Sequence, residues 1–510
     1  MRLFIPLFIM LALSWESHAQ FNYSYIMEYN NVRTRFIDNG LFFNNPQTGF
    51  GMYEVPKGGT RHVIYAGQFW YGGVDQLDQI KFSGDTYDGI AYGAGPLTIG
   101  TALPMTSPGQ WMFSVYRTDI LNHIANYQNE EYVMPMSIAN WPAHGNVAEG
   151  FSYHLAPFND VNNNGIYEPE VGDHPCIKGD QAIYMIINDK SGSQVNADAM
   201  GLELHYMFYQ FVSNDYLNNT TFVDLTVFNR GSMDLNDFKT SFFVDGDLGN
   251  YEDDYFGCDS TKNVAYFYNG DDFDEDFSGL WGYGSNPPAF GIVSLNQVMT
   301  SFSSYDPVSA SPFQKYNQMS GNLPDGSPMM NMSGQPTKFL YSGNPFTLTG
   351  DSEVEAMNPP GDRRGLITTN FGTFGAGDTL ELSYAILFQQ SGNSTESNAS
   401  DIIDMATIVQ QFYNDELNYS CLGAIAGLSE KENDKFNVYP NPHTNDFYVQ
   451  FDKIQQELTL EIHTLSGQNM LTEKHQNTSF VKLNFDGPSG IYLLTFKTEK
   501  GSFVQKVIKE

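Results

Sequence analysis

The sequence predicts a mainly β protein, built of several immunoglobulin-like β-sandwiches with one helix before a C-terminal β-sandwich. Aromatic residues make up 15% of the 510 residues, and the 47 Gly and 24 Pro suit short strands joined by many turns. Apolar runs bounded by Gly, Asn, Asp or Pro recur along the chain, for example at 182–187, 222–228 and 380–388. This length is also sufficient for more than one domain.

The first 19 residues have the features of a cleaved signal peptide. Arg2 precedes an apolar run at residues 3–13, and small residues at positions 17 and 19 predict cleavage after Ala19. A membrane anchor is the alternative, but this run would span only about half of a ~30 Å hydrocarbon core. No other stretch approaches about 18 uninterrupted apolar residues, so we expect no transmembrane segment in the mature chain.

The overall charge excludes one class of partner. The chain has 25 Lys and Arg against 59 Asp and Glu, which gives a net charge of −34. Binding to nucleic acid requires clustered basic side chains that neutralise phosphates. We therefore expect no nucleic-acid partner.

The body of the chain divides by composition near residue 140. Gly-rich strands before this point predict an N-terminal β-rich lobe over 20–140, with a short helix near 118–127. Longer strands and acid-rich loops after it predict an acidic β-sandwich lobe over 141–422.

One convincing helix is expected near the end of the acidic lobe. Over 401–417 the apolar residues recur at intervals of three and four, and Asn398 or Ser400 is available as the N-cap. A small and polar stretch at 423–433 follows and is typical of a linker.

The last segment, 434–510, is close to neutral and alternates apolar and polar residues between turn signals, which predicts a small β-sandwich. It resembles the C-terminal (type A) sorting domain of proteins exported by the type IX secretion system of Bacteroidetes. The matching motifs are Val438-Tyr439-Pro440-Asn441-Pro442, Leu465-Ser466-Gly467-Gln468, Pro488-Ser489-Gly490-Ile491-Tyr492-Leu493-Leu494 and Lys506-Val507-Ile508-Lys509. The resemblance implies that 434–510 is recognised by outer-membrane secretion machinery. It also implies a secreted or cell-surface protein whose sorting domain is clipped off after export.

Phrases in the body resemble large, uncharacterised secreted proteins of the same group. They include Trp141-Pro142-Ala143-His144-Gly145, Ala156-Pro157-Phe158 and Val244-Asp245-Gly246-Asp247-Leu248-Gly249. That group implies a shared scaffold and no particular chemistry.

The strongest local motif is an acid-rich and Asn-rich loop at 160–173. Asp160, Asn162 and Asn164 occupy positions one, three and five of a calcium loop, Gly165 permits the sharp turn, and the Ile166 carbonyl would be the next ligand. The first half resembles the loops of EF-hands and dockerins, but position twelve is an apolar residue. The missing carboxylate must then come from one of three acids, Glu168, Glu170 or Asp173. The alternative is a turn whose polar groups are satisfied by its own side chains.

A second acidic region spans 245–276. Four of its acids, Asp245, Asp247, Asp253 and Asp254, are candidate ligands for a further Ca²⁺, because an excess of hard oxygen donors favours that ion over a transition metal. Two solvated loops are an equally good interpretation. Pairs of carboxylates also serve glycoside hydrolysis, which requires a sugar cleft that the sequence cannot show.

Signatures of nucleophilic, phosphate-binding and transition-metal sites are missing from the sequence. We interpret His144 and His205 as structural residues. The three cysteines, Cys176, Cys258 and Cys421, allow one disulfide and one free thiol, with the pairing undetermined.

The sequence therefore favours a non-enzymatic, calcium-stabilised β-sandwich protein for adhesion, matrix structure or glycan binding. The alternative is a secreted polysaccharide-active hydrolase that uses Asp/Glu pairs. Aromatic residues on flat β-surfaces can stack on sugar rings, and the candidates are Trp70-Tyr71 and Trp281-Gly282-Tyr283, although most aromatic residues of a sandwich lie in its core. The partner would then be a surface glycan or a matrix ligand.

Overall fold

The computed structural model describes residues 23–105, 110–194, 197–305, 311–418, 436–439, 444, 446–464, 469–498 and 501–509. The chain forms two compact units, Met1–Ile425 and Ala426–Glu510, which we call the body and the tail unit. The expected signal peptide, the expected linker and Cys421 lie outside the described residues.

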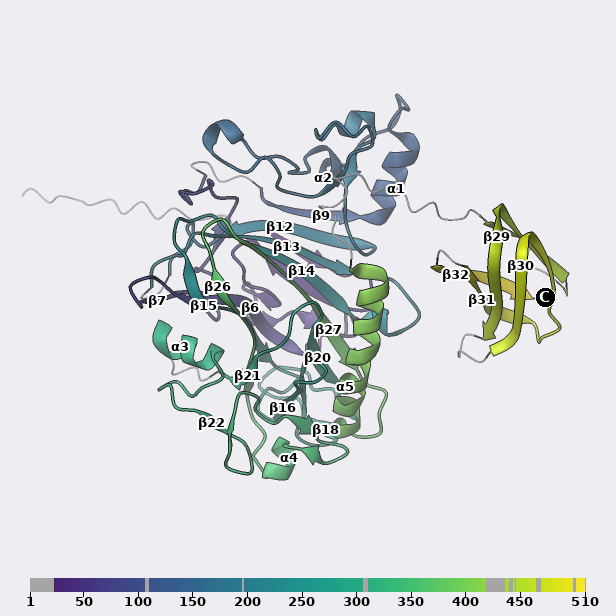
Figure 1. The fold of residues 1–510 in the computed structure, drawn as a ribbon. Coiled ribbons are helices and arrows are strands. Elements are labelled where there is room, and N and C mark those ends of the chain that lie inside the picture. Colours follow the sequence, from purple (N-terminus) through teal and green to yellow (C-terminus); the bar gives the residue numbers. More distant parts are fainter. Residues whose placement is uncertain are drawn as a thin grey trace, which may run out of the picture. The chain divides into compact units, whose positions relative to one another are not determined.

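The body is a sandwich of a nine-stranded and a five-stranded sheet, both antiparallel (Figure 1). The larger sheet has the order β16 (Asp254–Asp259), β17 (Val264–Asn269), β20 (Ala289–Ser294), β27 (Thr379–Gln389), β14 (Thr221–Asn229), β13 (Leu202–Gln210), β12 (Gln181–Asn188) and β8 (Gly93–Ala94), and β9 (Met112–Tyr116) also pairs with β12. The smaller sheet has the order β21 (Ser301–Ser304), β26 (Arg363–Phe374), β15 (Leu235–Gly246), β6 (Ile64–Val74) and β7 (Ile80–Ser83). The expected mainly β class is confirmed, and the body has more strands than the roughly seven to nine of an immunoglobulin sandwich.

The main core lies between the two sheets and is rich in aromatic residues. Phe69 of β6 stacks on Phe242 of β15, with ring centroids 4.3 Å apart, and also contacts Tyr384 of β27 in the opposite sheet. The hydroxyl groups of Tyr71 and Tyr206 lie 2.9 Å apart and link β6 to β13. The strand-forming aromatic residues of the sequence therefore hold the two layers together.

Each outer face of the sandwich is partly covered by a helix (Figure 1). Helix α5 (Thr395–Phe412) packs Ile402 and Val409 against the nine-stranded sheet. Helix α3 (Pro312–Met319) covers the five-stranded sheet, where Met319 joins an apolar cluster with Trp70 and Phe243. Period-two alternation along β15 thus places Phe242 inside the sandwich and Phe243 under α3.

The division expected near residue 140 is corrected by the strand pairing. β6 and β7 come before residue 140 and complete the five-stranded sheet with β15 and β26, which come after it. β8 and β9 likewise pair with β12. Residues 20–140 and 141–422 therefore share both sheets, because the early strands find their partners through long-range pairing and not within a lobe of their own.

Both expected helices are present, with shifted bounds. The helix expected near 118–127 is α1 (Arg117–Asn126). The helix expected near 401–417 is α5, which continues as a π-helical turn at Tyr413–Leu417. Its N-cap is Ser394, which forms a capping box with Ser397, whereas the Asn398 side chain bonds to Gly392 and to residues before β20. The cap lies earlier than expected because Asn398 is used in tertiary contacts.

The remaining elements of the body are short. They are β1 (Ser24–Met27), β2 (Arg33–Ile37) and β5 (Tyr53–Glu54) in one sheet, helices α2 (Met136–Ala139) and α4 (Glu353–Ala356), and the strand pairs β3 (Asn44–Asn45) with β4 (Phe50–Gly51), β10 (Phe158–Asn159) with β11 (His174–Pro175), β18 (Phe273–Asp274) with β19 (Gly284–Ser285), β22 (Met329–Met330) with β23 (Pro336–Thr337), and β24 (Gly343–Asn344) with β25 (Thr349–Gly350).

The tail unit is a five-stranded antiparallel sheet with its own core, as expected for 434–510. Its strands are β28 (Phe436–Tyr439), β29 (Asp446–Thr464), β30 (Asn469–Asn484), β31 (Gly490–Thr498) and β32 (Gly501–Lys509). Alternate residues such as Phe447, Val449 and Leu494 are buried together.

Candidate functional site: a carboxylate cleft on the five-stranded sheet

The antiparallel register of β15 and β26 brings charged residues face to face. Asp245 of β15 pairs with Arg364 of β26, and Gly246 pairs with Arg363. One step further along the same register, Asp247 comes opposite Asp362. Side chains two residues apart share a face, so Asp245 and Asp247 lie on the face that Phe243 occupies, the outer face of the sheet. Like charges directly opposite each other destabilise a strand pair, which makes this arrangement unusual.

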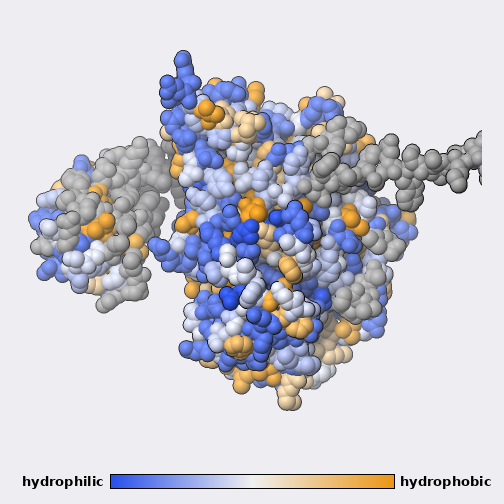
Figure 2. All heavy atoms as spheres, turned by 180° about the vertical axis from the view of Figure 1, so that it is seen from behind, coloured by the Kyte–Doolittle hydropathy of each residue, from blue (hydrophilic) through white to orange (hydrophobic). Residues whose placement is uncertain are grey.

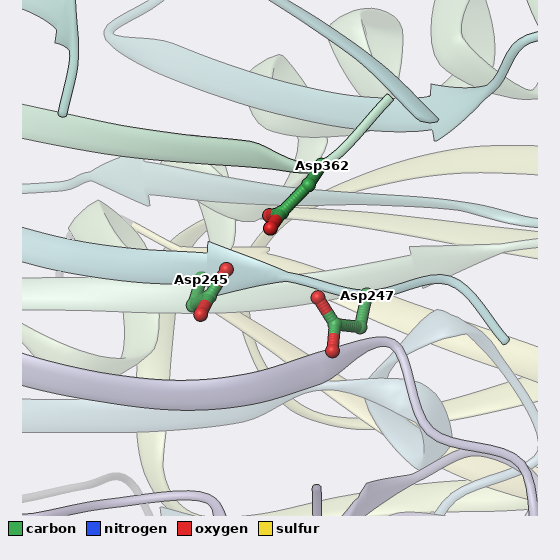
Figure 3. A group of neighbouring side chains, drawn as sticks. All are labelled: Asp245, Asp247 and Asp362. Carbon is green, nitrogen blue, oxygen red and sulfur yellow. The ribbon is translucent and has the colours of Figure 1, made fainter. Parts of the chain in front are cut away.

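The three carboxylates converge on one point. Figure 3 shows Asp362 directed toward the space between Asp245 and Asp247. An oxygen atom of each lies within 4.8 Å of an oxygen atom of the others. They line a cleft of about 580 Å³ together with Arg364, Tyr65, Tyr87 and Phe50. The site is therefore a concave surface that combines acidic and aromatic side chains, the composition of many ligand sites.

Arg364 and Tyr87 hold two of the three carboxylates in place. Tyr87 donates its hydroxyl hydrogen to Asp245 Oδ2 (2.6 Å), and Arg364 Nη2 donates to Asp362 Oδ2 (2.5 Å). Arg364 Nε also lies 3.3 Å from Asp245 Oδ2. The second oxygens, Asp245 Oδ1 and Asp362 Oδ1, are buried and have no hydrogen-bond partner among the described residues. One oxygen of each carboxylate is thus anchored, and the other is left available.

His62 also lines the cleft. Its side chain is only 5% exposed, and its Nε2 lies 4.0 Å from Asp247 Oδ2, which is too long for a hydrogen bond. Within the described part of the chain Nε2 has no partner. Burial lowers the pKa of His62 to about 4, so the imidazole is neutral at physiological pH.

Two of the carboxylates, Asp245 and Asp247, have raised pKa values. Burial raises the pKa of Asp245 to about 6, although Arg364 and Tyr87 act in the opposite direction. Burial also raises the pKa of Asp247 well above its usual value, and the charges of Asp245 and Asp362 raise it further. Without a compensating charge, Asp245 and Asp247 therefore bind protons more tightly than exposed carboxylates do.

The structure separates the four acids that the sequence grouped in this region. Asp245 and Asp247 share the cleft, whereas Asp253 and Asp254 lie at the start of β16 and do not belong to the same cluster of oxygens. Asp254 is fully buried and accepts a hydrogen bond from the Leu248 N–H group. Asp362 and His62 were not expected from the sequence, because their place in the cleft depends on strand pairing and no local motif marks them.

In the loop at 160–173, the side chains bond to the loop itself. Asp160 accepts hydrogen bonds from the N–H groups of Asn164 and Gly165, and Asn164 Oδ1 accepts one from Ile166. Asn162 Oδ1 accepts a hydrogen bond from the Asn164 N–H group, and Glu168 accepts one from the Asn164 side-chain amide. The Asp173 carboxylate accepts hydrogen bonds from the N–H groups of Val161 and Glu168, whereas Glu170 is exposed. Asp160, Glu168 and Asp173 form no cluster of three carboxylate oxygens like that of the cleft. These bonds suit a self-satisfied turn, and calcium binding at the loop stays a prediction.

The aromatic candidates for sugar stacking differ in exposure. Trp70 and Tyr71 are fully buried, so these two candidates form no sugar-stacking surface and lie in the core, as most aromatic residues of a sandwich do. Strand alternation alone could not reveal this, because both faces of β6 are covered. Tyr283 packs against the core and donates to the Val55 carbonyl, whereas Trp281 is 57% exposed.

The histidines and cysteines agree with the structural roles expected for them. His144 Nε2 accepts a hydrogen bond from the Tyr167 N–H group, and the buried His205 lies within 2.9 Å of both the Tyr184 hydroxyl and Glu203 Oε1. Cys176 is in a disulfide, and Cys258 is a buried free thiol.

The visible surface of the body is mostly polar (Figure 2). On the face shown in Figure 2, hydrophilic residues predominate and apolar residues gather in small, separate patches. Among the described helices, none has the length and apolar character needed to cross a bilayer.

Comparison with known proteins identifies the tail unit. Residues 437–510 match the family model of the secretion system C-terminal sorting domain. The chain is therefore a type IX secretion cargo protein, and the sorting domain implies contact with the secretion machinery and a secreted or cell-surface location. No curated protein matches the sequence.

One solved structure similar to this chain is a polysaccharide lyase, at 8% identity and a TM-score of 0.18. The match covers 70% of this chain and 39% of the lyase, so the chain spans well under half of that protein's length.

Proposed function

We propose that the body is a secreted or cell-surface glycan-binding protein and that the carboxylate cleft is its binding site. The observation that carries the proposal is the convergence of three carboxylates in a cleft that is also lined by Tyr65, Tyr87 and exposed Phe50. Carboxylate oxygens accept hydrogen bonds from sugar hydroxyls, and aromatic rings cover the apolar faces of sugar rings.

The charge of the site selects among glycans. Asp245, Asp247 and Asp362 face a single cation, Arg364, and the whole chain carries a net charge of −34. The net negative charge of the chain would repel acidic polysaccharides whether or not the cleft itself is neutralised. The expected ligand is therefore a neutral polyhydroxylated glycan.

Hydrolysis is the second candidate, because the pKa of Asp245 is raised to about 6 beside an even more perturbed Asp247. A carboxyl that is protonated near neutral pH beside an ionised one is what acid-base catalysis on glycosides requires. One oxygen of Asp362 also lies within 4.8 Å of an oxygen of each of these two, however, whereas glycosidases use a pair of carboxyl groups that flank the scissile bond. Convergence of three carboxylates favours binding over hydrolysis.

Affinity electrophoresis of the purified body in gels containing xylan, mannan or β-glucan tests the proposal. We expect retardation by at least one neutral polysaccharide and its loss in Phe50→Ala, whereas Phe346→Ala, which removes an exposed ring outside the cleft, should bind normally. Equal retardation of both variants, or of neither in any gel, would contradict the proposal. Release of reducing ends from the same polysaccharides would support the hydrolase instead.

We keep calcium at the 160–173 loop as part of this proposal, in a role that supports the fold. The loop joins β10 to β11. Two hydrogen bonds connect it to the preceding segment, because the Tyr153 hydroxyl donates to the Gly165 carbonyl and the Tyr167 hydroxyl donates to the Ile138 carbonyl. An ion there would stabilise the folded body by mass action.

A further inference from the structure

We infer that the three carboxylates of the cleft, Asp245, Asp247 and Asp362, hold a divalent cation. This goes beyond the proposed glycan binding, because the cation requires no sugar in order to bind. The first observation is geometric: oxygens from all three side chains lie within 4.8 Å of one another, and Figure 3 shows them directed at a common point. An ion placed among them would meet oxygen ligands from two strands.

The second observation is the buried His62. Its side chain is 5% exposed and lines the same cleft, and its Nε2 has no hydrogen-bond partner among the described residues. Buried polar atoms are nearly always paired, so a buried orphan nitrogen beside orphan carboxylate oxygens indicates a missing ligand. Asp245 Oδ1 and Asp362 Oδ1 are orphaned in the same way.

The hydrogen bonds around the cluster support this assignment. Tyr87 and Arg364 bind Oδ2 of Asp245 and of Asp362, and Oδ1 of each has no hydrogen-bond partner among the described residues. Such partners fix the orientation of metal ligands in known sites. Because of these bonds, Asp245 and Asp362 cannot turn away from each other without losing a partner.

Charge balance gives the valence. Asp245, Asp247 and Asp362 contribute three negative charges when ionised, and Arg364 contributes one positive charge, so a single divalent ion neutralises the set. Carboxylate oxygens suit Ca²⁺ and Mn²⁺, and an imidazole nitrogen suits transition-metal ions, so Mn²⁺ is the transition-metal ion that this mainly oxygen-lined site would accept. Both ions therefore belong in the test.

Equilibrium dialysis of the body against Ca²⁺ or Mn²⁺, without any glycan, measures the site directly. All variants carry the Asp160→Ala substitution, so that the 160–173 loop contributes no bound ion. We expect about one bound ion per chain, and loss of that ion in the Asp247→Asn/Asp362→Asn double variant. The matched control is Asp404→Asn, because its side chain lies on the opposite sheet's helix α5 and is 74% exposed. Equal uptake by the double variant and the control would overturn the inference.

A second measurement protects the test against a variant that misfolds. Tb³⁺ replaces these ions and emits when excited through a nearby tyrosine, and Tyr87 contacts Asp245. We expect Tyr87→Phe to reduce this emission. In the unsubstituted cleft, we expect added Ca²⁺ or Mn²⁺ to displace Tb³⁺ and so abolish the emission. Emission that Tyr87→Phe leaves unchanged, or that neither ion displaces, would also overturn the inference. Since glycan is absent throughout, failure here is distinct from failure of the proposed function.

Discussion

Removal of one charge from the cleft should stabilise the body when no cation is present. Asp247→Asn keeps the size of the side chain but removes the negative charge that faces Asp362. Asp247 is only 6% exposed, and burial, followed by the charges of Asp245 and Asp362, raises its pKa. Both effects disfavour the anion in the folded state. The neutral amide relieves them without creating a cavity.

The Coulomb energy sets the size of this gain. At the 4.8 Å that bounds the separation of the oxygens, two unit charges in an effective dielectric of about 20 repel by about 3.5 kcal/mol. Arg364 offsets part of this repulsion, and the wild-type carboxyl avoids another part by taking up a proton. We therefore expect a gain of about 1 to 2 kcal/mol in the free energy of unfolding at neutral pH.

The pH dependence has a definite sign. The folded pKa of Asp247 lies above the value of about 3.9 in the unfolded chain. Folding therefore binds a proton between these two values, and the wild-type body loses stability as the pH rises through the folded pKa. Below about pH 4 the carboxyl is protonated in both states, so the advantage of Asp247→Asn should vanish there.

Urea unfolding in the presence of chelator, monitored by tryptophan fluorescence at about pH 4 and about pH 8, measures the gain in stability and its pH dependence. Asp404→Asn serves as the control and should change stability by no more than about 0.5 kcal/mol. Calcium should reverse the order at the higher pH by stabilising the wild type alone. A variant less stable than the wild type in chelator at the higher pH, or a gain independent of pH, would refute the reasoning.

Three further predictions concern other parts of the chain. Trp70→Ala should lower the free energy of unfolding by about 3 to 5 kcal/mol, because Trp70 stacks on Phe243 with ring centroids 4.9 Å apart. The control Trp281→Ala removes an exposed ring and should lower it by about 0.5 kcal/mol or less, so similar urea midpoints for the two variants would contradict the prediction. Deletion of 434–510 should leave the melting temperature of the body unchanged but keep the protein in the periplasm, and recovery from the medium would argue against it. Millimolar calcium should stabilise the wild type by about 1 kcal/mol through the 160–173 loop, and less in Asp160→Ala; a chelator-insensitive melting temperature would rule out an ion there.

Local patterns predicted the elements better than their partners. Alternation and turn residues were sufficient for the strands at 182–187, 222–228 and 380–388, which became β12, β14 and β27. The boundary near residue 140 failed because composition reports local character, whereas β6 pairs with β15 across more than 150 residues. Local pattern could not decide between an exposed and a buried Trp70 for a related reason, since the helix that covers it, α3, lies far along the chain.

The cleft was half predictable. The sequence groups Asp245 and Asp247 as candidate ligands, and since Asp247 directly follows β15 the two-residue spacing keeps both on one face. Asp362 joins them only through the register of β15 with β26, and His62 through burial beside β6. Asp253 and Asp254, although close to Asp247 in sequence, follow the turn into a different sheet.

The outer face of β15 shows where function departs from folding. Phe243 and Leu366 lie on this face beneath α3 and close an apolar cluster, and the next outward positions on the two strands are Asp245 and Arg364. The apolar pattern could have continued, and two more apolar side chains there would have extended the cluster at no electrostatic cost. Instead the strands end in opposed carboxylates whose charge the fold disfavours. An arrangement that weakens the empty protein is most readily explained by a ligand that compensates it, and a cation among Asp245, Asp247 and Asp362 does so.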